Sequence, residues 1–336
     1  MRLRDIPECA RIVACHPTLG PRYGADIANV TALWRRLFAN EWYFTSSVFE
    51  EVEGARVKVL GVGLAVFVSD DFLQEAKNPP SFWLGPEITR RVTRGHSPLL
   101  TDKQVSEANS SDGLNLLVLQ TGLNPEHFGQ PETQVVAAMA FVEGHRGFRL
   151  KEVFAQAESA EHLAGLLRFG TLVLGATEEQ NLGSDPQRLQ QIVQEPHLVG
   201  LNRETVARQR GSWFASLFFY RAPQLGFSRG EQQLLLAGMD GKTDEELSDS
   251  LGVSLSAVKK AWRLIYARVT EHLPGLIPSH LSEEAVPQDR GREKKRHLLA
   301  YLREHPEELR PVSRKLLQQG AAGTFSSTGS NSKANP

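Results

Sequence analysis

Residues 227–269 read FSRGEQQLLLAGMDGKTDEELSDSLGVSLSAVKKAWRLIYARV, and this stretch decides the fold of the C-terminal part of the 336-residue chain. It contains two capping boxes, in which a Ser or Thr is followed three residues later by Glu: Ser228 with Glu231, and Thr243 with Glu246. A capping box satisfies backbone amides that would otherwise be unpaired at the start of a helix. The sequence therefore predicts that a helix begins at each box.

Glycines and a serine set the other boundaries. The first helix is expected to run to about Ala237 and to close at Gly238 and Gly241. Gly252 can adopt the left-handed conformation that ends the second helix, and Ser254 can cap a third helix after a three-residue turn. Three short helices with a tight corner between the last two form a helix-turn-helix.

The third helix separates an apolar face from a basic face. Its apolar residues recur at spacings of three and four, which places one stripe toward the core: Leu255, Val258, Trp262, Ile265 and Val269. The preceding corner is expected to add Leu247, Leu251 and Val253 to that core. The residues on or near the opposite side are Ser256, Lys259, Lys260, Arg263 and Ala267. An exposed face with three cations suits a groove lined by phosphates.

The order and spacing resemble the LuxR-type, or GerE-type, helix-turn-helix of bacterial transcriptional regulators. The matching residues are Phe227-Ser228, Glu231, Leu234 to Leu236, Gly241-Lys242-Thr243, Glu246-Leu247, Leu251-Gly252-Val253-Ser254 and Val258-Lys259. The resemblance implies that Lys259, Lys260 and Arg263 face the major groove of double-stranded DNA, with Ser256 as a further contact. It also implies a homodimer and RNA polymerase as partners.

Other classes of protein stay open. Three-helix units of this kind also serve as protein–protein adaptors, and region 4 of sigma factors has a similar corner. The LuxR family continues into a fourth helix that supports dimerisation, whereas residues 272–278 of this chain include two prolines. The geometry of a dimer therefore cannot be inherited from the family.

The amino-acid composition indicates which class of protein the chain belongs to. With 40% hydrophobic and 23% charged residues, the chain is expected to be globular and to hold about two domains. Its net charge of −1 means that affinity for nucleic acid must come from local patches. Cys9 and Cys15 fit neither a CxxC pair nor a zinc site, so we expect no disulfide framework and no metal. Without a signal peptide or membrane segment, the protein is expected to be soluble and cytoplasmic, with no membrane partner.

The first 220 residues predict a mixed α/β domain. Helices are expected at residues 6–15, 27–38 and 133–157, the last with a break near Gly144 or Gly147. Strands are expected at residues 47–53, 57–68, 115–120 and 171–174, the first two joined as a hairpin at Glu53-Gly54. Gly61 and Gly63 inside the second strand indicate a bulge or a close backbone approach. Residues 182–210 predict a connecting helical region, and residues 213–220 a buried strand or a dimer surface.

This order of helix, hairpin, strand, helix and strand resembles a GNAT-type acetyltransferase fold, as do the opening residues 2–7 and 10–13. In that family an [QR]-x-x-G-x-[GA] loop at a helix N-terminus binds acetyl-CoA. The nearest segment here, Gly144 to Arg149, has Gly first and Arg last. Because the motif is not intact, we assign no catalytic residue and no cofactor. An acetyltransferase with an appended DNA-binding module is the alternative function.

Residues 145–151 contain a histidine and three cationic side chains. His145, Arg146 and Arg149 could bind an anion or another small ligand. The competing interpretation is the solvated face of a helix whose Phe148, Val153 and Phe154 pack inward.

The expected organisation is an α+β, or mixed α/β, N-terminal domain and an all-α helix-turn-helix C-terminal domain. Residues 1–220 sense a small molecule or dimerise, and residues 225–270 bind DNA. A basic helical extension follows at 281–318, where Leu298, Leu299, Leu302 and Leu309 form an apolar side. Residues 319–336 are expected to be disordered. The sequence thus predicts a transcriptional regulator.

Overall fold

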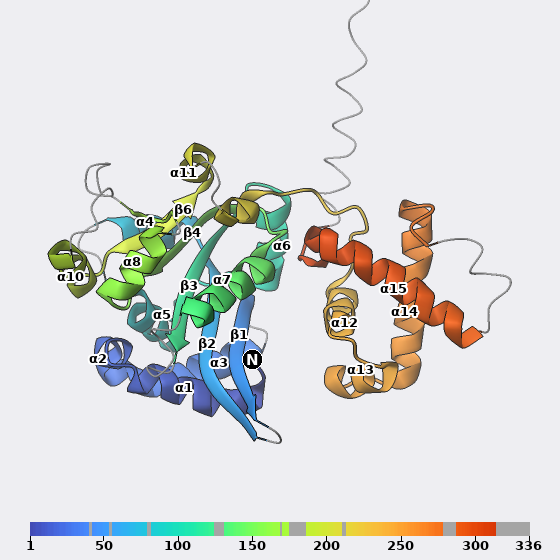
Figure 1. The fold of residues 1–336 in the computed structure, drawn as a ribbon, viewed down its shortest axis with the longest axis horizontal. Helices are drawn as coiled ribbons and strands as arrows, with labels where there is room; N and C mark the ends of the chain where they lie inside the picture. Colours follow the sequence, from blue (N-terminus) through green and yellow to red (C-terminus); the bar gives the residue numbers. More distant parts are fainter. Residues whose placement is uncertain are drawn as a thin grey trace, which may run out of the picture. The chain divides into compact units, whose positions relative to one another are not determined.

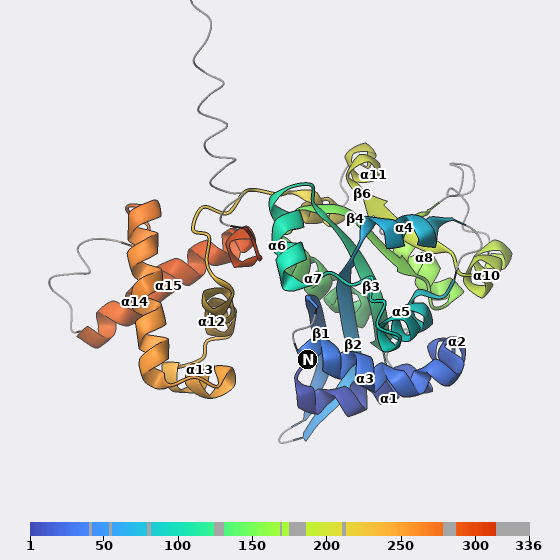
Figure 2. The same cartoon turned by 180° about the vertical axis from the view of Figure 1, so that it is seen from behind.

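The computed structural model describes residues 1–39, 42–53, 56–78, 82–123, 131–168, 170–174, 186–209, 213–277 and 287–313. The chain is a mixed α+β protein with one six-stranded sheet, as Figures 1 and 2 show from opposite sides. It divides into two compact units. The first comprises Met1–Ala108 and Asp112–Phe219, and the second comprises Asn109–Ser111 and Tyr220–Pro336.

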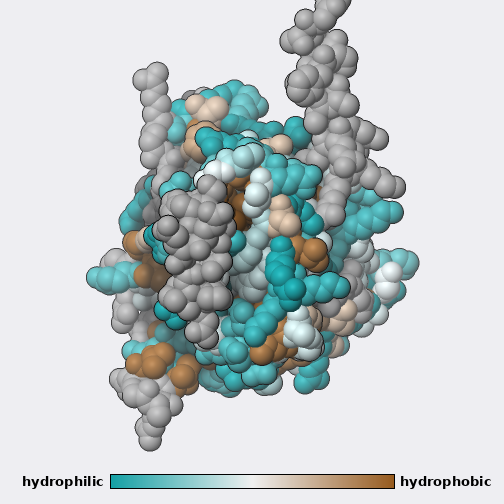
Figure 3. Space-filling model, turned by 90° about the vertical axis from the view of Figure 1, so that its right-hand side faces the viewer, coloured by the Kyte–Doolittle hydropathy of each residue, from teal (hydrophilic) through white to brown (hydrophobic). Residues whose placement is uncertain are grey.

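The second unit contains four α-helices among its described residues: α12 (Arg229–Met239), α13 (Asp244–Leu251), α14 (Leu255–His272) and α15 (Pro287–Glu304). A short 3-10 helix, η6 (Pro306–Leu309), follows α15. Figure 3 colours one face of the molecule by hydropathy. Hydrophilic residues dominate that face, and hydrophobic residues form separate small patches.

One hydrophobic cluster joins all four helices of this unit. Its fully buried members include Leu235, Leu247, Val258, Ile265, Val269, Leu298 and Leu302. Leu299 and Leu309 belong to the same cluster, so the apolar side expected for residues 281–318 is buried against α12 and α14. The described residues of the basic extension, 287–313, thus contribute to the core of the second unit.

Two details of this unit differ from the expectations. Helix α12 continues to Met239, because Gly238 packs inside it, where an added Cβ would lie 3.4 Å from the Trp262 ring. Val253 is 43% exposed and does not enter the core, since the three-residue turn directs it to solvent.

The sheet of the first unit runs in the order β1-β2-β3-β4-β6-β5. Its strands are β1 (Phe44–Glu53), β2 (Arg56–Val68), β3 (Leu114–Leu123), β4 (Leu150–Gln156), β5 (Leu172–Val173) and β6 (Leu198–Asn202). Only the β3–β4 pair is parallel, and the other neighbours are antiparallel. The expected hairpin strands and the strands at 115–120 and 171–174 are confirmed, whereas residues 54 and 55 of the turn lie outside the described residues.

The bulge expected in the hairpin is also present. Phe49 is paired with Gly61, but Glu50 is paired with Val59, so the register shifts by one residue. The extra residue in β2 bends the strand at this point.

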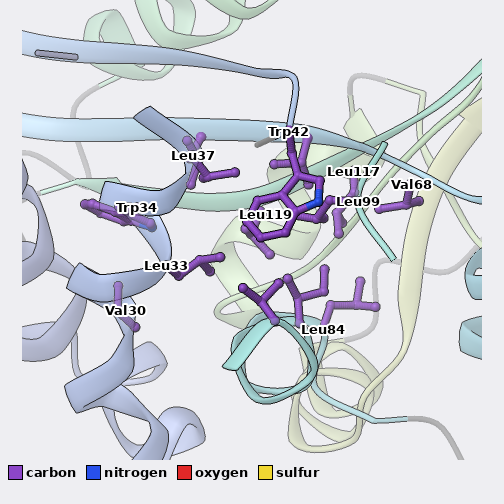
Figure 4. Close-up of a cluster of buried hydrophobic side chains, with 14 of the residues drawn as sticks. Val30, Leu33, Trp34, Leu37, Trp42, Val68, Leu84, Leu99, Leu117 and Leu119 are labelled. Atoms are coloured by element: carbon purple, nitrogen blue, oxygen red, sulfur yellow. The ribbon is translucent and has the colours of Figure 1, made fainter. Parts of the chain in front are cut away.

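Strand alternation divides the core between the two faces of the sheet. Val62, Leu64 and Val66 of β2 pack against α1 (Ile6–Cys15), α3 (Ile27–Phe38) and α5 (Leu84–Thr93). On the opposite face, Ala65 and Phe67 pack with α6 (Asp102–Ser110) and α7 (Pro131–His145). Figure 4 shows side chains of α3 meeting Trp42, Leu117 and Leu119. Both amphipathic helices expected near the N-terminus are confirmed.

Among its described residues, the first unit has five further α-helices: α2 (Leu19–Tyr23), α4 (Asp70–Lys77), α8 (Ala160–Arg168), α10 (Pro186–Gln194) and α11 (Arg203–Arg208). Helices α8 and α10 share a small cluster with β5 and β6. This arrangement places α8 beside the end of β4.

The helix expected at 133–157 is wrong in its second half. Helix α7 ends at His145, Gly147 adopts a left-handed φ of 85°, and β4 begins at Leu150. Val153 and Phe154 belong to clusters on opposite faces of the sheet. This alternation has the period of two that defines a strand.

Two segments before residue 220 are also corrected. In the described residues 186–209 of the expected helical connector, α10 and α11 are helices, but β6 between them lies in the sheet between β4 and β5, so the segment is part of the domain. Residues Trp213–Phe218 form a 3-10 helix, η4, instead of a strand. Phe214 and Leu217 are buried at a spacing of three, which matches the repeat of a 3-10 helix.

Within the described part of the chain, no helix combines the length and apolar character needed to cross a bilayer. The same residues contain no cluster of three or more His, Cys, Asp or Glu side chains suited to a metal ion. Cys9 is buried, Cys15 is exposed, and both are free thiols. Residues 319–336, expected to be disordered, lie outside the described residues.

Candidate functional site

The turn between α13 and α14 is closed by local hydrogen bonds. Gly252 has a left-handed φ of 65° and ends α13. The Ser254 hydroxyl accepts a hydrogen bond of 3.2 Å from the amide of Ala257 and so caps α14. Both capping boxes are formed, and each Glu carboxylate accepts a 2.7 Å hydrogen bond from the amide of its Ser or Thr. These contacts fix the direction in which α14 leaves the corner.

Helix α14 presents one exposed polar face. Its buried residues are Val258, Trp262, Ile265 and Val269, while Leu255 is half-buried. The four residues that are expected to contact DNA are all exposed: Ser256, Lys259, Lys260 and Arg263. Among the described residues, none of these three cations forms an ion pair. Their charges therefore remain available to a bound anion.

Ser256 has a local role as well. Its hydroxyl lies 2.9 Å from the hydroxyl of Ser254, the residue that caps α14. If Ser256 contacts DNA, its hydroxyl would bond both to the DNA and to the Ser254 hydroxyl that caps α14.

Two other cations stabilise the unit. Arg268 lies at the far end of α14 and donates a 2.7 Å hydrogen bond to Glu231. Lys295 of α15 donates to the carbonyl of Lys242 and lies 5.0 Å from the centre of the Trp262 ring. Sequence spacing gave no signal for these contacts, because the partners are separated by 37 and 53 residues. They connect α14 to α12 and to α15, and they also connect α15 to the turn before α13.

We expect the Glu231→Gln variant to lose about 1 kcal/mol of stability at pH 7, because Gln keeps the capping box but removes the charge beside Arg268. Burial acts to raise the pKa of Glu231, but hydrogen bonds from Arg268 and Ser228 outweigh it and lower the pKa. A lowered pKa in the folded state gives stability that is present at neutral pH and is lost as the pH falls. The measurement is urea unfolding of both proteins between pH 7 and pH 3.

The difference between wild type and variant should shrink as wild-type Glu231 is protonated. Glu246→Gln is the matched control, since Glu246 occupies the same place in the second capping box and has no cation bonded to it in the described structure. An equal loss in both variants would show that Arg268 contributes nothing.

The first unit contains a cavity of about 270 Å³ where β3 and β4 separate. These parallel strands stop pairing after Leu117 and Phe154. Residues Val118 to Thr121 of β3 and Ala155 to Gln156 of β4 then line the opening. Side chains from α2, α5, α7 and α8 close its sides.

Of the three residues expected to bind an anion, only His145 lines this cavity. His145 is 5% exposed, donates from Nδ1 to the carbonyl of Phe141, and accepts from the hydroxyl of Thr45 at Nε2. Arg146 forms an ion pair with Glu143 one turn earlier, and the carbonyl of Arg149 accepts from the amide of Leu114. The structure does not bring the three side chains together at the cavity.

The segment Gly144 to Arg149 also lies at the wrong end of a helix for binding a phosphate. It follows the C-terminus of α7, where free carbonyls and the helix dipole disfavour an anion. The competing interpretation is partly confirmed, since Phe148, Val153 and Phe154 are buried. It is wrong in assigning them to a helix, because two of them lie on β4.

Comparison with protein-family models, with curated proteins and with solved structures finds no match for this chain. The function is therefore inferred from the geometry and chemistry of the structure itself. Two candidate sites are the exposed face of α14 and the cavity beside β3.

Proposed function

We propose that this protein is a sequence-specific, DNA-binding transcriptional regulator of LuxR type that acts in the cytoplasm. The observation that supports the proposal is the face of α14, where Lys259, Lys260 and Arg263 are exposed and unpaired among the described residues, opposite a buried stripe. The first unit would sense a small molecule or dimerise. RNA polymerase and a second copy of the chain are the proposed protein partners.

The dimensions of α14 suit this role. Its 18 residues span roughly 27 Å, and a B-DNA major groove about 12 Å wide admits one helix. In a helix-turn-helix, the N-terminal part of the second helix contacts base edges. Ser256, Lys259, Lys260 and Arg263 occupy that part of α14. Contacts with phosphates would provide affinity, and contacts with base edges would provide specificity.

Selection of genomic DNA fragments on the purified protein, at several salt concentrations, tests the proposal. We expect the retained fragments to share a motif with dyad symmetry, because a dimer reads two half-sites. Retention without a common motif, or no retention, would contradict sequence-specific regulation and favour a protein–protein adaptor.

We expect Arg263→Ala to weaken binding to the selected sequence by roughly 1 to 3 kcal/mol and to relax the preference at one base position. The bidentate guanidinium recognises guanine in the major groove, and alanine cannot replace it. Binding is measured by fluorescence anisotropy with the selected sequence and its single-base variants. Arg94→Ala, which removes an exposed arginine from the first unit, is the control. Unchanged affinity of Arg263→Ala would exclude Arg263 from the interface.

A GNAT-like acetyltransferase with an appended DNA-binding module is the second candidate. The cavity between the diverging parallel strands β3 and β4 favours it, because an enzyme needs a concave site that can enclose its substrate. A ligand that binds the folded state must raise the melting temperature. Millimolar acetyl-CoA should therefore stabilise the protein if this candidate is right, and the absence of a shift would count against it.

A further inference from the structure

One end of the cavity contains a buried acid that neither candidate function uses. Glu158, which is 3% exposed, lies just before α8 and lines the cavity with His162. Its Oε2 atom lies 3.4 Å from Nε2 of His16 and 3.9 Å from Nδ1 of His162. A carboxyl group in such surroundings requires a structural or a binding explanation.

Polar atoms without partners gather in this cavity. Within the described part of the chain, Gln120 Oε1 and Thr171 Oγ1 are buried and have no hydrogen-bond partner. Glu158 Oε2 is also buried and makes no well-directed hydrogen bond, although His16 Nε2 lies 3.4 Å away, and all three residues line the cavity. The amide nitrogen of Gln120 donates to the hydroxyl of Tyr23 over 2.6 Å, which orients Oε1 as a free acceptor. A buried acceptor without a donor is unfavourable by about 1 to 3 kcal/mol. A ligand that brings donors would remove this cost.

The charges around Glu158 restrict the ligand further. Burial raises the pKa of Glu158 to about 8 and lowers the pKa of His162 to about 4, so both groups are mainly uncharged at pH 7. Burial also lowers the pKa of His16. Arg22 is the nearby cation, and its guanidinium donates to the carbonyls of Ala157 and Val193 and lies 3.8 Å from the centre of the Trp83 ring. A cationic ligand would meet Arg22 without a carboxylate to compensate it.

The remaining walls are largely apolar. They include the rings of Tyr23, Trp83 and Phe141, with Leu119 and Leu166. The volume of about 270 Å³ exceeds the roughly 150 Å³ in which an engineered apolar cavity binds benzene. A bicyclic aromatic molecule is a reasonable probe for this space.

We propose that this cavity binds an uncharged, mainly apolar small molecule that donates N–H or O–H hydrogen bonds to Glu158 and Gln120. Binding is a property of the first unit and requires no DNA. Its test is therefore independent of the function proposed for α14.

The test compares two probes of the same shape, indole, which has one N–H donor, and benzofuran, which has an oxygen acceptor in its place. Titration calorimetry of the full chain measures both dissociation constants. We expect indole to bind at least about tenfold more tightly, because only indole can donate to the free acceptors, and the aromatic ring oxygen of benzofuran is a poor acceptor for the proton of the uncharged Glu158 carboxyl. Equal affinities for the two probes, or no binding of either at millimolar concentration, would overturn the proposal.

Variants of Glu158 locate the donor contact. Glu158→Leu should lose the preference for indole, whereas Glu158→Gln, which keeps an acceptor oxygen, should retain it. Glu161→Gln is the matched control, since Glu161 lines the same cavity but is exposed. Melting temperatures show whether each variant folds; Glu158→Leu should melt somewhat lower than wild type, because leucine cannot accept from the Thr121 amide or face His16, whereas Glu158→Gln should stay closer to wild type. A full preference for indole in a folded Glu158→Leu variant would assign the donor contact elsewhere and refute the role of Glu158.

Discussion

Replacing Lys259, Lys260 and Arg263 together by alanine is expected to reduce binding to the selected DNA at least about 100-fold at physiological salt. Each cation that contacts a phosphate or base edge contributes roughly 1 to 3 kcal/mol. The three side chains lie on the exposed face of one helix, so a single groove can contact them all. The association constant of the triple variant should also fall less steeply with salt concentration. The slope of its logarithm against log salt should decrease in magnitude by about 0.9 for each phosphate contact removed.

The control is a triple alanine variant of the exposed residues Arg94, Lys103 and Arg208 in the first unit, which changes the net charge by the same amount. Anisotropy titrations at several salt concentrations compare the two variants with wild type. Since all six residues are exposed, both variants should keep the melting temperature of wild type. An equal loss of DNA binding in both would mean that net charge, rather than the face of α14, determines the affinity.

The parts of the fold that sequence could predict are those with local causes. The start of α12 depends on Ser228 and Glu231, three residues apart, and their hydrogen bonds form whatever the rest of the chain does. The buried stripe of α14 follows from the 3.6-residue repeat in the same way. Such signals need only a few neighbouring residues, which is why these helices were predicted with correct N-terminal ends.

The incorrect predictions concern segments whose conformation depends on pairing with distant strands. Residues 150–156 contain apolar side chains that a helix could also bury, and their strand conformation depends on β3 and β6, which pair with them from distant parts of the chain. The five residues of β6 are similarly defined by β4 and β5. Neither pairing has a signature within the segment itself.

The cavity residues were missed for the same reason. The sequence indicates Gln120 only as the end of a buried strand, and it contains no local signal for Glu158. The fold places Tyr23 against Gln120, and His16 and His162 beside Glu158, from three separate segments. The available sequence signal for a cavity residue was a polar side chain at the end of a buried strand. Gln120, which ends the segment NLLVLQ, is such a residue.

Replacing Leu302 by alanine is expected to destabilise the second unit by about 2 to 5 kcal/mol. Leu302 lies on α15, is completely buried, and belongs to the cluster that contains Leu235 and Ile265. Truncation removes apolar contacts and leaves a cavity between α15 and the helices it covers. A typical domain has a stability of only about 5 to 15 kcal/mol, so the loss is a large fraction of the total.

Native-state hydrogen exchange of α12 and α14 in the full chain measures this loss, because their slowest amides report the opening of the unit. Leu264→Ala is the matched control: Leu264 lies on α14 and is 54% exposed, so its truncation should change stability by less than about 0.5 kcal/mol. If Leu302→Ala behaved like the control, α15 would not belong to the folded core. If the expected loss is found, the proposed DNA-binding helix α14 is held in place by a helix outside the 43 residues that resemble the LuxR family, because α15 then belongs to the same folded core.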